Sequence, residues 1–159
     1  MKILYDYQAF EKIYEGVSRY YCEIVKHLNP KIEREIAIKY SRNSWIKDIL
    51  PYVIYPFGKL YVPFKRRLVR KLNHYEYISK LKNSKYDLFH ATFDDSYFLP
   101  FVKTPFIITV HDLIPESEKV PWCENCLKSR SQVFSKGEHI ITVSQKYKKR
   151  FTNLLPFFG

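Results

Sequence analysis

Cysteine, glycine and acidic residues are scarce in this sequence. Its 159 residues include 3 Cys, 4 Gly and 16 Asp and Glu, against 27 Lys and Arg. An odd number of cysteines argues against a disulfide-stabilised scaffold and suits a reducing compartment. So little glycine excludes collagen-like and low-complexity chains. No apolar run approaches the roughly 20 residues of a membrane-spanning helix, and the opening MKILYDYQAF lacks the apolar stretch of a signal peptide.

Aromatic residues, in contrast, are plentiful. They make up 18% of the chain, and 46% of all residues are hydrophobic. Disordered polyelectrolytes contain few aromatic residues, so that class is excluded. A chain of this length fits one domain and is long enough to bury a core of its own. We therefore expect a single domain spanning residues 1–159.

The excess of positive charge is local. Residues 59–82 contain eight Lys and Arg but only one acid, Glu76, which gives +7 of the net +11. Such a patch is typical of surfaces that contact phosphate in nucleic acid, lipid headgroups or a phosphorylated ligand. Aromatic residues before the patch favour binding to an anionic membrane. The alternative is that the patch is only the solvated face of a core helix. No sequence motif supports binding to nucleic acid. The candidate membrane or anion patch comprises Lys65, Arg66, Arg67, Arg70 and Lys71.

Apolar runs and helical patterns alternate along the chain. Short apolar or β-branched runs predict strands at 2–7, 34–40, 86–91, 105–111 and 139–143. Periodic patterns predict helices at 16–28, 64–82, 122–136 and 144–155. The segment 8–15 is predicted to be a loop, and 41–63 shows no regular pattern. Apolar strands that alternate with helices indicate a parallel sheet covered on both faces, so the predicted fold class is a doubly wound α/β domain.

The predicted helix 64–82 has one apolar stripe, which we expect to be its buried face. Arg66 and Arg70 lie across from this stripe. The stripe consists of Phe64, Leu68, Leu72, Tyr75 and Ile78.

In a doubly wound sheet, ligands bind outside the carboxyl ends of the strands. His111 ends the most apolar run, where it could exchange a hydrogen bond with a substrate hydroxyl while Asp112 orients it. His90 ends the preceding strand in the same way, shortly before Thr92. The alternative for each histidine is a structural role. Ser144, after the last predicted strand, is expected to cap the helix that follows.

Gly16 opens the first predicted helix, directly after the first strand and loop. A helix N-terminus there has free N–H groups and the positive end of a dipole, which suit an anion. An ordinary turn and cap is the alternative. Cys123 and Cys126 form a C-x-x-C, but a structural zinc site needs four ligands, so we expect ordinary thiols and no metal site.

Three segments together resemble glycosyltransferase family 4. The run DYQAFEKIYEGVSRYYCEIVKHL is similar to that family's opening loop and helix, and YDLFHATFDDSYFLPFVKTPFIITVHDLIPE is similar to its Asp-x-x-His and Thr-(Val/Ile)-His-Asp-Leu-Ile-Pro-Glu strands. HIITVSQKYKKRF resembles its Ile-Ile-x-Val-Ser element. The order and intervals fit over nearly the whole chain.

The resemblance implies a GT-B enzyme made of two Rossmann-like domains, of which this chain would be the N-terminal, acceptor-binding half. The nucleotide-sugar donor would be held mainly by a C-terminal domain through a Glu-x7-Glu motif, and that domain is missing here. A retaining, metal-independent transfer to a glycan or lipid-linked acceptor is implied, in polysaccharide biosynthesis at the cytoplasmic side of a membrane. Alone, the chain would be inactive. It would be either a truncated chain or one subunit that works with a separate C-terminal domain subunit. The alternative is a non-enzymatic module that binds a glycan or an anionic membrane.

Carried over to this chain, the resemblance makes His111 the catalytic residue beside the transferred sugar. Gly16 matches a glycine near the donor phosphates, whereas Glu15 replaces another glycine and would repel phosphate. The expected substrate-binding residues are Gly16, Ser18, Arg19, His90, Thr92, Asp112 and Ser144.

Overall fold

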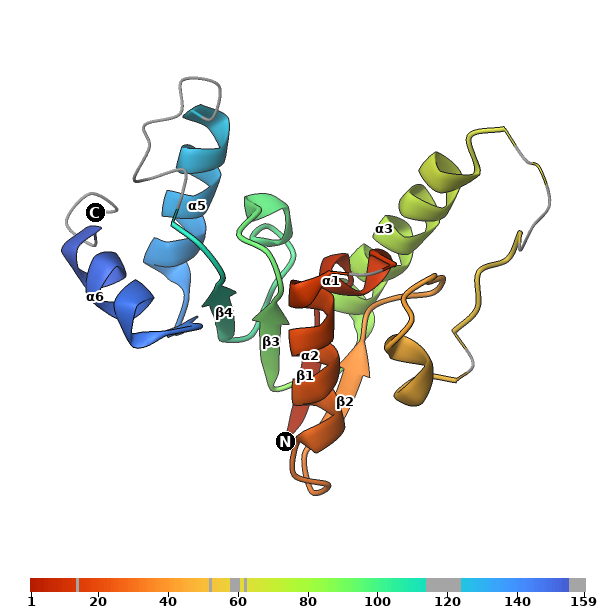
Figure 1. The fold of residues 1–159 in the computed structure, drawn as a ribbon, viewed down its shortest axis with the longest axis horizontal. Coiled ribbons are helices and arrows are strands. Elements are labelled where there is room, and N and C mark those ends of the chain that lie inside the picture. Colours follow the sequence, from red (N-terminus) through yellow and green to blue (C-terminus); the bar gives the residue numbers. More distant parts are fainter. Residues whose placement is uncertain (14, 52, 58–60, 62, 114–123, 155–159) are drawn as a thin grey trace.

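The computed structural model describes residues 1–13, 15–51, 53–57, 61, 63–113 and 124–154. Within them, five parallel strands form one sheet with the order β2-β1-β3-β4-β5 (Figure 1). The strands are β1 (Lys2–Tyr5), β2 (Glu33–Ile36), β3 (Leu88–Ala91), β4 (Phe106–Val110) and β5 (His139–Thr142). The predicted α/β class with a parallel sheet is confirmed, and the strand order reverses between β1 and β3.

Helices connect the strands. They are α1 (Gln8–Glu11), α2 (Gly16–His27), α3 (Lys65–Asn83), α5 (Glu124–Lys136) and α6 (Gln145–Leu154), with short 3₁₀ turns η1 (Ile46–Asp48) and η2 (Ser96–Phe98). The predicted helices are confirmed within the described residues; Trp122 and Leu155 lie outside them. The predicted loop 8–15 is wrong in part, because it contains α1, whose single turn is too short to leave a periodic pattern.

The two faces of the sheet carry different helices. Side chains alternate along a strand, and on β3 the Phe89 ring lies 6.1 Å from Tyr77 of α3 while the His90 ring lies 5.3 Å from Tyr21 of α2. Helices α2 and α3 therefore cover opposite faces, which is the doubly wound arrangement of a Rossmann-like fold.

Helix α2 follows its sequence pattern closely. Its buried residues, spaced at three and four, are Ser18, Tyr21, Cys22 and Val25. The helix begins at Gly16 and gives way at Leu28 to extended backbone, just before Asn29-Pro30, where proline disfavours helix in the preceding residue.

The predicted buried stripe of α3 is wrong. Phe64, Leu68, Leu72 and Tyr75 are between 36% and 80% exposed, and only Ile78 is partly buried against the core. The buried residues are instead Val69, Asn73, Tyr77 and Leu81.

Asn73 explains the difference. Its Oδ1 accepts hydrogen bonds from the backbone N–H groups of Lys39 (3.3 Å) and Tyr40 (2.9 Å), and its Nδ2 donates to the carbonyl of Tyr40 (2.8 Å). The side chain thus satisfies backbone that follows β2, which a buried amide must do. Because a polar residue lies in the middle of the buried face, hydrophobic periodicity does not identify that face.

Strand β5 forms one edge of the sheet, since it pairs only with β4 among the described residues. Its residue Ile141 is 38% exposed, and Val143 just beyond it is 41% exposed. This end of the sheet therefore leaves apolar side chains in contact with water.

The cysteines differ from one another. Cys22 is a free, buried thiol, whereas Cys126 is disulfide-bonded. The expectation of an ordinary thiol is therefore wrong for Cys126; Cys123 lies outside the described residues.

None of the described helices has the length and apolar content of a transmembrane segment.

Candidate functional site

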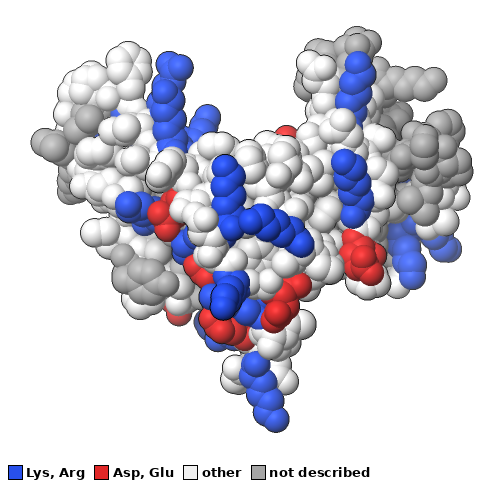
Figure 2. All heavy atoms as spheres, turned by 180° about the vertical axis from the view of Figure 1, so that it is seen from behind, with Lys and Arg blue, Asp and Glu red and all other residues white. Residues whose placement is uncertain are grey.

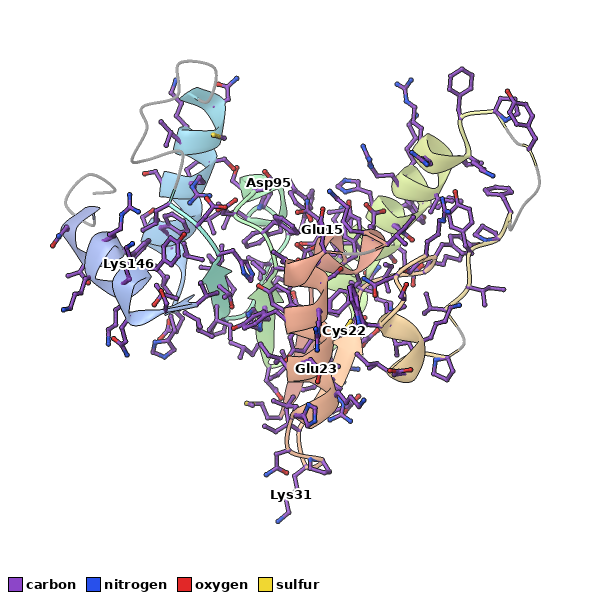
Figure 3. All side chains as sticks on the ribbon, in the orientation of Figure 1. Glu15, Cys22, Glu23, Lys31, Asp95 and Lys146 are labelled. Atoms are coloured by element: carbon purple, nitrogen blue, oxygen red, sulfur yellow. The ribbon has the colours of Figure 1, made fainter. Side chains whose placement is uncertain are left out.

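The carboxyl ends of the strands lie in a notch. In Figure 1 the arrows of β2, β3 and β4 point toward the same end, between α5 and α3. Figure 2 shows the molecular surface hollowed between two lobes at this end. Glu15, before α2, and Asp95, after β3, are both at this end, whereas Lys31 is at the opposite one (Figure 3). The notch is where a doubly wound sheet binds its ligands.

A buried carboxylate links the segments that follow β1 and β3, at the point where the strand order reverses. Asp6, which follows β1, accepts hydrogen bonds from the Tyr97 hydroxyl (3.0 Å) and the Thr92 hydroxyl (3.1 Å). Thr92 Oγ1 in turn accepts the N–H of Ala9 at 3.2 Å. Burial raises the pKa of Asp6 to about 6, although the hydrogen bond from Tyr97 opposes that shift. The predicted binding residue Thr92 thus joins the loops that follow β1 and β3.

The side chain of His90 is buried against the sheet, with 3% of the residue's surface exposed. Its Nε2 is 3.0 Å from the Thr109 hydroxyl, and its ring packs 5.2 Å from Tyr5 and 5.3 Å from Tyr21. Burial, with His111 nearby, lowers the pKa of His90 to about 4. His90 is therefore a neutral imidazole held between β3, β4 and α2.

His111 stands at the carboxyl end of β4. Its ring meets Tyr20 at 5.2 Å and Tyr21 at 5.6 Å, both edge-on. Burial lowers the pKa of His111, although the Asp112 carboxylate opposes this. Its Nε2 is shielded and has no hydrogen-bond partner among the described residues. A buried polar atom without a partner costs about 1–3 kcal/mol, so it calls for an explanation.

The start of α2 is open. Gly16 is exposed, and a Cβ placed on it would meet no atom within 4 Å. Arg19 is also exposed, and its N–H donates to the Glu15 carbonyl at 3.1 Å. The Glu15 carboxylate pairs with Lys12 at 2.9 Å. The Glu15 carboxylate is thus neutralised by a neighbouring cation.

Two other predicted binding residues have local partners. Ser18 is fully buried, where its hydroxyl donates to the Ala9 carbonyl and accepts from Asn43 Nδ2 at 2.6 Å. Ser144 Oγ accepts the N–H of Tyr147 at 3.3 Å, so the predicted cap of α6 is confirmed. Ser18 holds α1, α2 and the segment after β2 together.

The sequence pattern missed a buried ion pair at the rim of the notch. Arg130 of α5, only 6% exposed, pairs with Asp94, which follows β3. Its Nη2 also donates to the Asp112 carbonyl at 2.9 Å. Burial raises the pKa of Asp94, opposed by Arg130. Arg130 therefore fixes the loops after β3 and β4, including the residue next to His111. Nothing in the spacing of Asp94 and Arg130 indicates this contact.

Compared with known proteins, the chain matches no protein family, no curated protein and no solved structure. The geometry of the notch therefore carries the functional argument.

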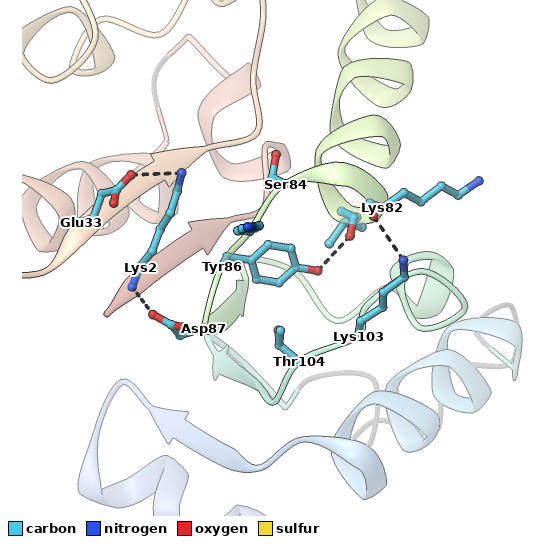
Figure 4. A pocket seen from close by; sticks show the side chains of 10 residues that line it. Lys2, Glu33, Lys82, Ser84, Tyr86, Asp87, Lys103 and Thr104 are labelled. Atoms are coloured by element: carbon cyan, nitrogen blue, oxygen red, sulfur yellow. Dashed lines mark hydrogen bonds and ion pairs between the residues drawn. The ribbon is translucent and has the colours of Figure 1, made fainter.

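The opposite end of the sheet holds a cavity of about 390 Å³ (Figure 4). Some of its charged groups contact one another or the backbone, whereas Lys82, Lys85 and Lys103 form no ion pair among the described residues. Lys2 Nζ pairs with Glu33 at 3.0 Å, the Lys2 N–H donates to Asp87 at 2.6 Å, and Lys103 Nζ donates to the Lys82 carbonyl at 3.2 Å. This cavity lies at the amino ends of the strands, whereas doubly wound sheets bind their ligands at the carboxyl ends. No cluster of three potential metal ligands exists among the described residues.

The basic patch lies on the first turns of α3. Arg66, Arg67, Arg70 and Lys71 are all exposed. On the face shown in Figure 2, Lys and Arg project from both lobes, while Asp and Glu gather over the lower half. The structure thus leaves the notch flanked by positive charge.

Proposed function

We propose that the chain is the acceptor-binding domain of a glycosyltransferase of the GT-B type. The observation that carries this proposal is the His111 Nε2 at the carboxyl end of β4, which is shielded and has no hydrogen-bond partner among the described residues while its ring packs against Tyr20 of α2. The resemblance of three segments to glycosyltransferase family 4 supports it, because each segment contributes a residue that follows the carboxyl end of a parallel strand: Asp6, His111 and Ser144.

In this function, neutral His111 hydrogen-bonds a sugar hydroxyl at the reaction centre. The Asp112 backbone, held by Arg130, positions the histidine, and the open start of α2 at Gly16 takes a polar or anionic group. The nucleotide-sugar would be bound mainly by a second domain or subunit. Because transfer requires donor and acceptor to be oriented together, the chain alone is inactive. Its place would be the cytoplasm, at the inner face of the membrane.

Titration of the isotope-labelled chain with a panel of mono- and disaccharides, followed by NMR, tests the acceptor site. We expect shifts at Gly16 and His111, and the His111→Ala variant should weaken binding at least tenfold. His139→Ala is the matched control, since His139 is exposed at the other end of the sheet. Saccharide binding that is equal in both variants, or sugar transfer by the purified chain alone, would overturn the proposal.

A second candidate function is binding to an anionic membrane. Its support is the outward face of α3, where Leu68, Leu72 and Tyr75 are 44%, 36% and 75% exposed beside the basic patch. Aromatic and aliphatic side chains enter the headgroup region while Lys and Arg attract anionic lipid.

Vesicle sedimentation separates this candidate from the first. The chain should bind vesicles containing phosphatidylglycerol, less so at high salt, and not vesicles of phosphatidylcholine alone. Leu68→Glu with Leu72→Glu should abolish binding, whereas Lys146→Glu with Lys148→Glu on exposed α6 should reduce it less. Equal loss in both double variants would mean a diffuse charge effect and remove this candidate.

A further inference from the structure

A second cavity, of about 550 Å³, opens beside the notch. Its walls come from the connection between α1 and α2, the segment after β2, and the inner side of α3. The residues used below are Lys12, Tyr40, Arg42, Tyr55, Arg66 and Arg70. Unlike the cavity at the opposite end of the sheet, it lies at the carboxyl ends of the strands.

Of the cations of this cavity, only Lys12 is paired with one of its acids among the described residues. Arg42, Arg66 and Arg70 form no ion pair among the described residues. The two acids in the wall are already engaged, because Glu11 accepts from Asn73 Nδ2 at 2.9 Å and Glu15 pairs with Lys12 at 2.9 Å. Three guanidinium groups therefore border one cavity without a counter-ion from this part of the chain.

Two tyrosines shape the cavity. The Arg42 guanidinium lies 5.2 Å from the centre of the Tyr55 ring, over its face, which restricts its orientation. The Tyr55 hydroxyl is shielded and has no hydrogen-bond partner among the described residues. Tyr40 is fixed through its backbone by Asn73. A positioned guanidinium is a group that recognises an oxyanion.

Helical spacing divides the basic patch into two faces. Arg66 and Arg70 flank buried Val69 and line the cavity. Arg67 and Lys71 do not line it. Lys71 also lies three residues after exposed Leu68, on the same side of the helix.

We propose that this cavity binds the phosphate group of a phosphorylated acceptor. The inference rests on the proposed acceptor function, which it extends by naming the chemical class of acceptor. Planar guanidinium groups bind phosphate in a bidentate manner, and three of them suit a dianion. From Glu15 in the cavity wall to Tyr20 against His111 is five helical residues, about 7.5 Å of rise. Helix α2 therefore connects the cavity wall at Glu15 with the His111 site at Tyr20.

Calorimetric titration with inorganic phosphate, glucose 1-phosphate, glucose and a short-chain phosphatidic acid tests the proposal. Glucose 1-phosphate should bind more tightly than glucose by tenfold or more. Arg66→Ala with Arg70→Ala should remove that difference. Arg67→Ala with Lys71→Ala, which removes the same charge from the outer face, should change binding less than threefold. Tight binding of phosphatidic acid with the same dependence on Arg66 and Arg70 would assign the phosphate to a lipid, and preference for the sugar phosphate to a soluble or glycan-linked acceptor.

Equal weakening in the two double variants, or no preference for glucose 1-phosphate over glucose, would overturn the proposal. The outcome is separable from that for the acceptor function. His111→Ala should leave the affinity for inorganic phosphate unchanged. Saccharide shifts at His111 without any phosphate binding would retain the acceptor function and reject only the phosphate site.

Discussion

Asp6 and His90 are neighbouring buried groups whose pKa values are shifted in opposite senses. The Asp6 N–H donates to the His90 carbonyl at 3.1 Å, so Asp6, just after β1, lies beside His90 of β3. Burial raises the pKa of the Asp6 carboxyl from 3.8 to about 6 and lowers that of the His90 imidazole from 6.5 to about 4. Both side chains are therefore neutral in the folded protein between about pH 4 and pH 6.

These shifts should cancel in the pH dependence of stability. Between pH 4 and 6, unfolding releases a proton from Asp6, which makes the folded state less stable as pH rises. Over the same window unfolding takes up a proton at His90, which makes the folded state less stable as pH falls. Each slope amounts to about 1.4 kcal/mol per pH unit. The pair together contributes little.

Single substitutions should reveal the pH dependence of stability that each of the two groups contributes. Asp6→Asn leaves His90, so the free energy of unfolding should fall from pH 6 to pH 4 relative to the native protein. His90→Gln leaves Asp6, so it should fall from pH 4 to pH 6. Urea unfolding at pH 4, 5, 6 and 7 measures both. If the two variants show slopes of the same sign relative to the native protein, the assignment of these shifts is wrong.

Ser18 gives a second prediction at this scale. Ser18→Ala removes the hydroxyl that bonds the Ala9 carbonyl and Asn43 Nδ2. Because these partners are buried and lose a bond, the free energy of unfolding should fall by about 1–3 kcal/mol. Ser135→Ala, at an exposed position, should change it by less than about 0.5 kcal/mol. Equal denaturant midpoints for the two variants would contradict a structural role for Ser18.

Elements differ in how far sequence predicts them. Strand β4 and helix α2 are predictable because each carries one uninterrupted pattern, apolar in β4 and spaced at three and four in α2. Helix α3 is predictable as a helix but not in its orientation. Its buried face contains Asn73, whose partner Tyr40 is 33 residues away, and local periodicity holds no information about such a partner.

The true face of α3 can be tested with two leucines. Leu81 is 1% exposed and Leu72 is 36% exposed. Leu81→Ala should lower the free energy of unfolding by about 2–5 kcal/mol, as expected when a buried leucine leaves a cavity. Leu72→Ala should cost less than about 1 kcal/mol. If Leu72→Ala lowered the free energy of unfolding more than Leu81→Ala in thermal or urea unfolding, the stripe that the sequence pattern predicted would be the buried face.

At the scale of the whole molecule, the site is only partly predictable. The rule that ligands bind at strand ends identifies His90 and His111, because a strand end can be read from sequence. It does not identify Arg130 or the role of Asp6, since these depend on how α5 and the loops pack in three dimensions. It also cannot tell that His90 points inward while His111 keeps a nitrogen that has no partner in the part of the chain that the structure describes.

The apolar edge of the sheet affects how whole molecules associate. Unpaired strand edges with exposed apolar side chains promote edge-to-edge pairing. Ile141→Lys on β5 should therefore raise the concentration at which the chain associates, as seen by analytical ultracentrifugation. Ile54→Lys is the control, because Ile54 is 65% exposed but lies outside the sheet. Identical sedimentation of both variants and the native chain would exclude β5 as an association site.

The strand order also dictates when the fold can form. The first strand pairs with β3 through Ile3 and Leu88, residues 85 positions apart. During synthesis, β1 must therefore wait until residues beyond Leu88 have left the ribosome before its second edge is covered. Parallel pairings across long crossovers close slowly, and their open edges attract other chains meanwhile. We expect refolding to be limited by this closure rather than by the helices, so a nascent chain that ends before β3 should depend on chaperones.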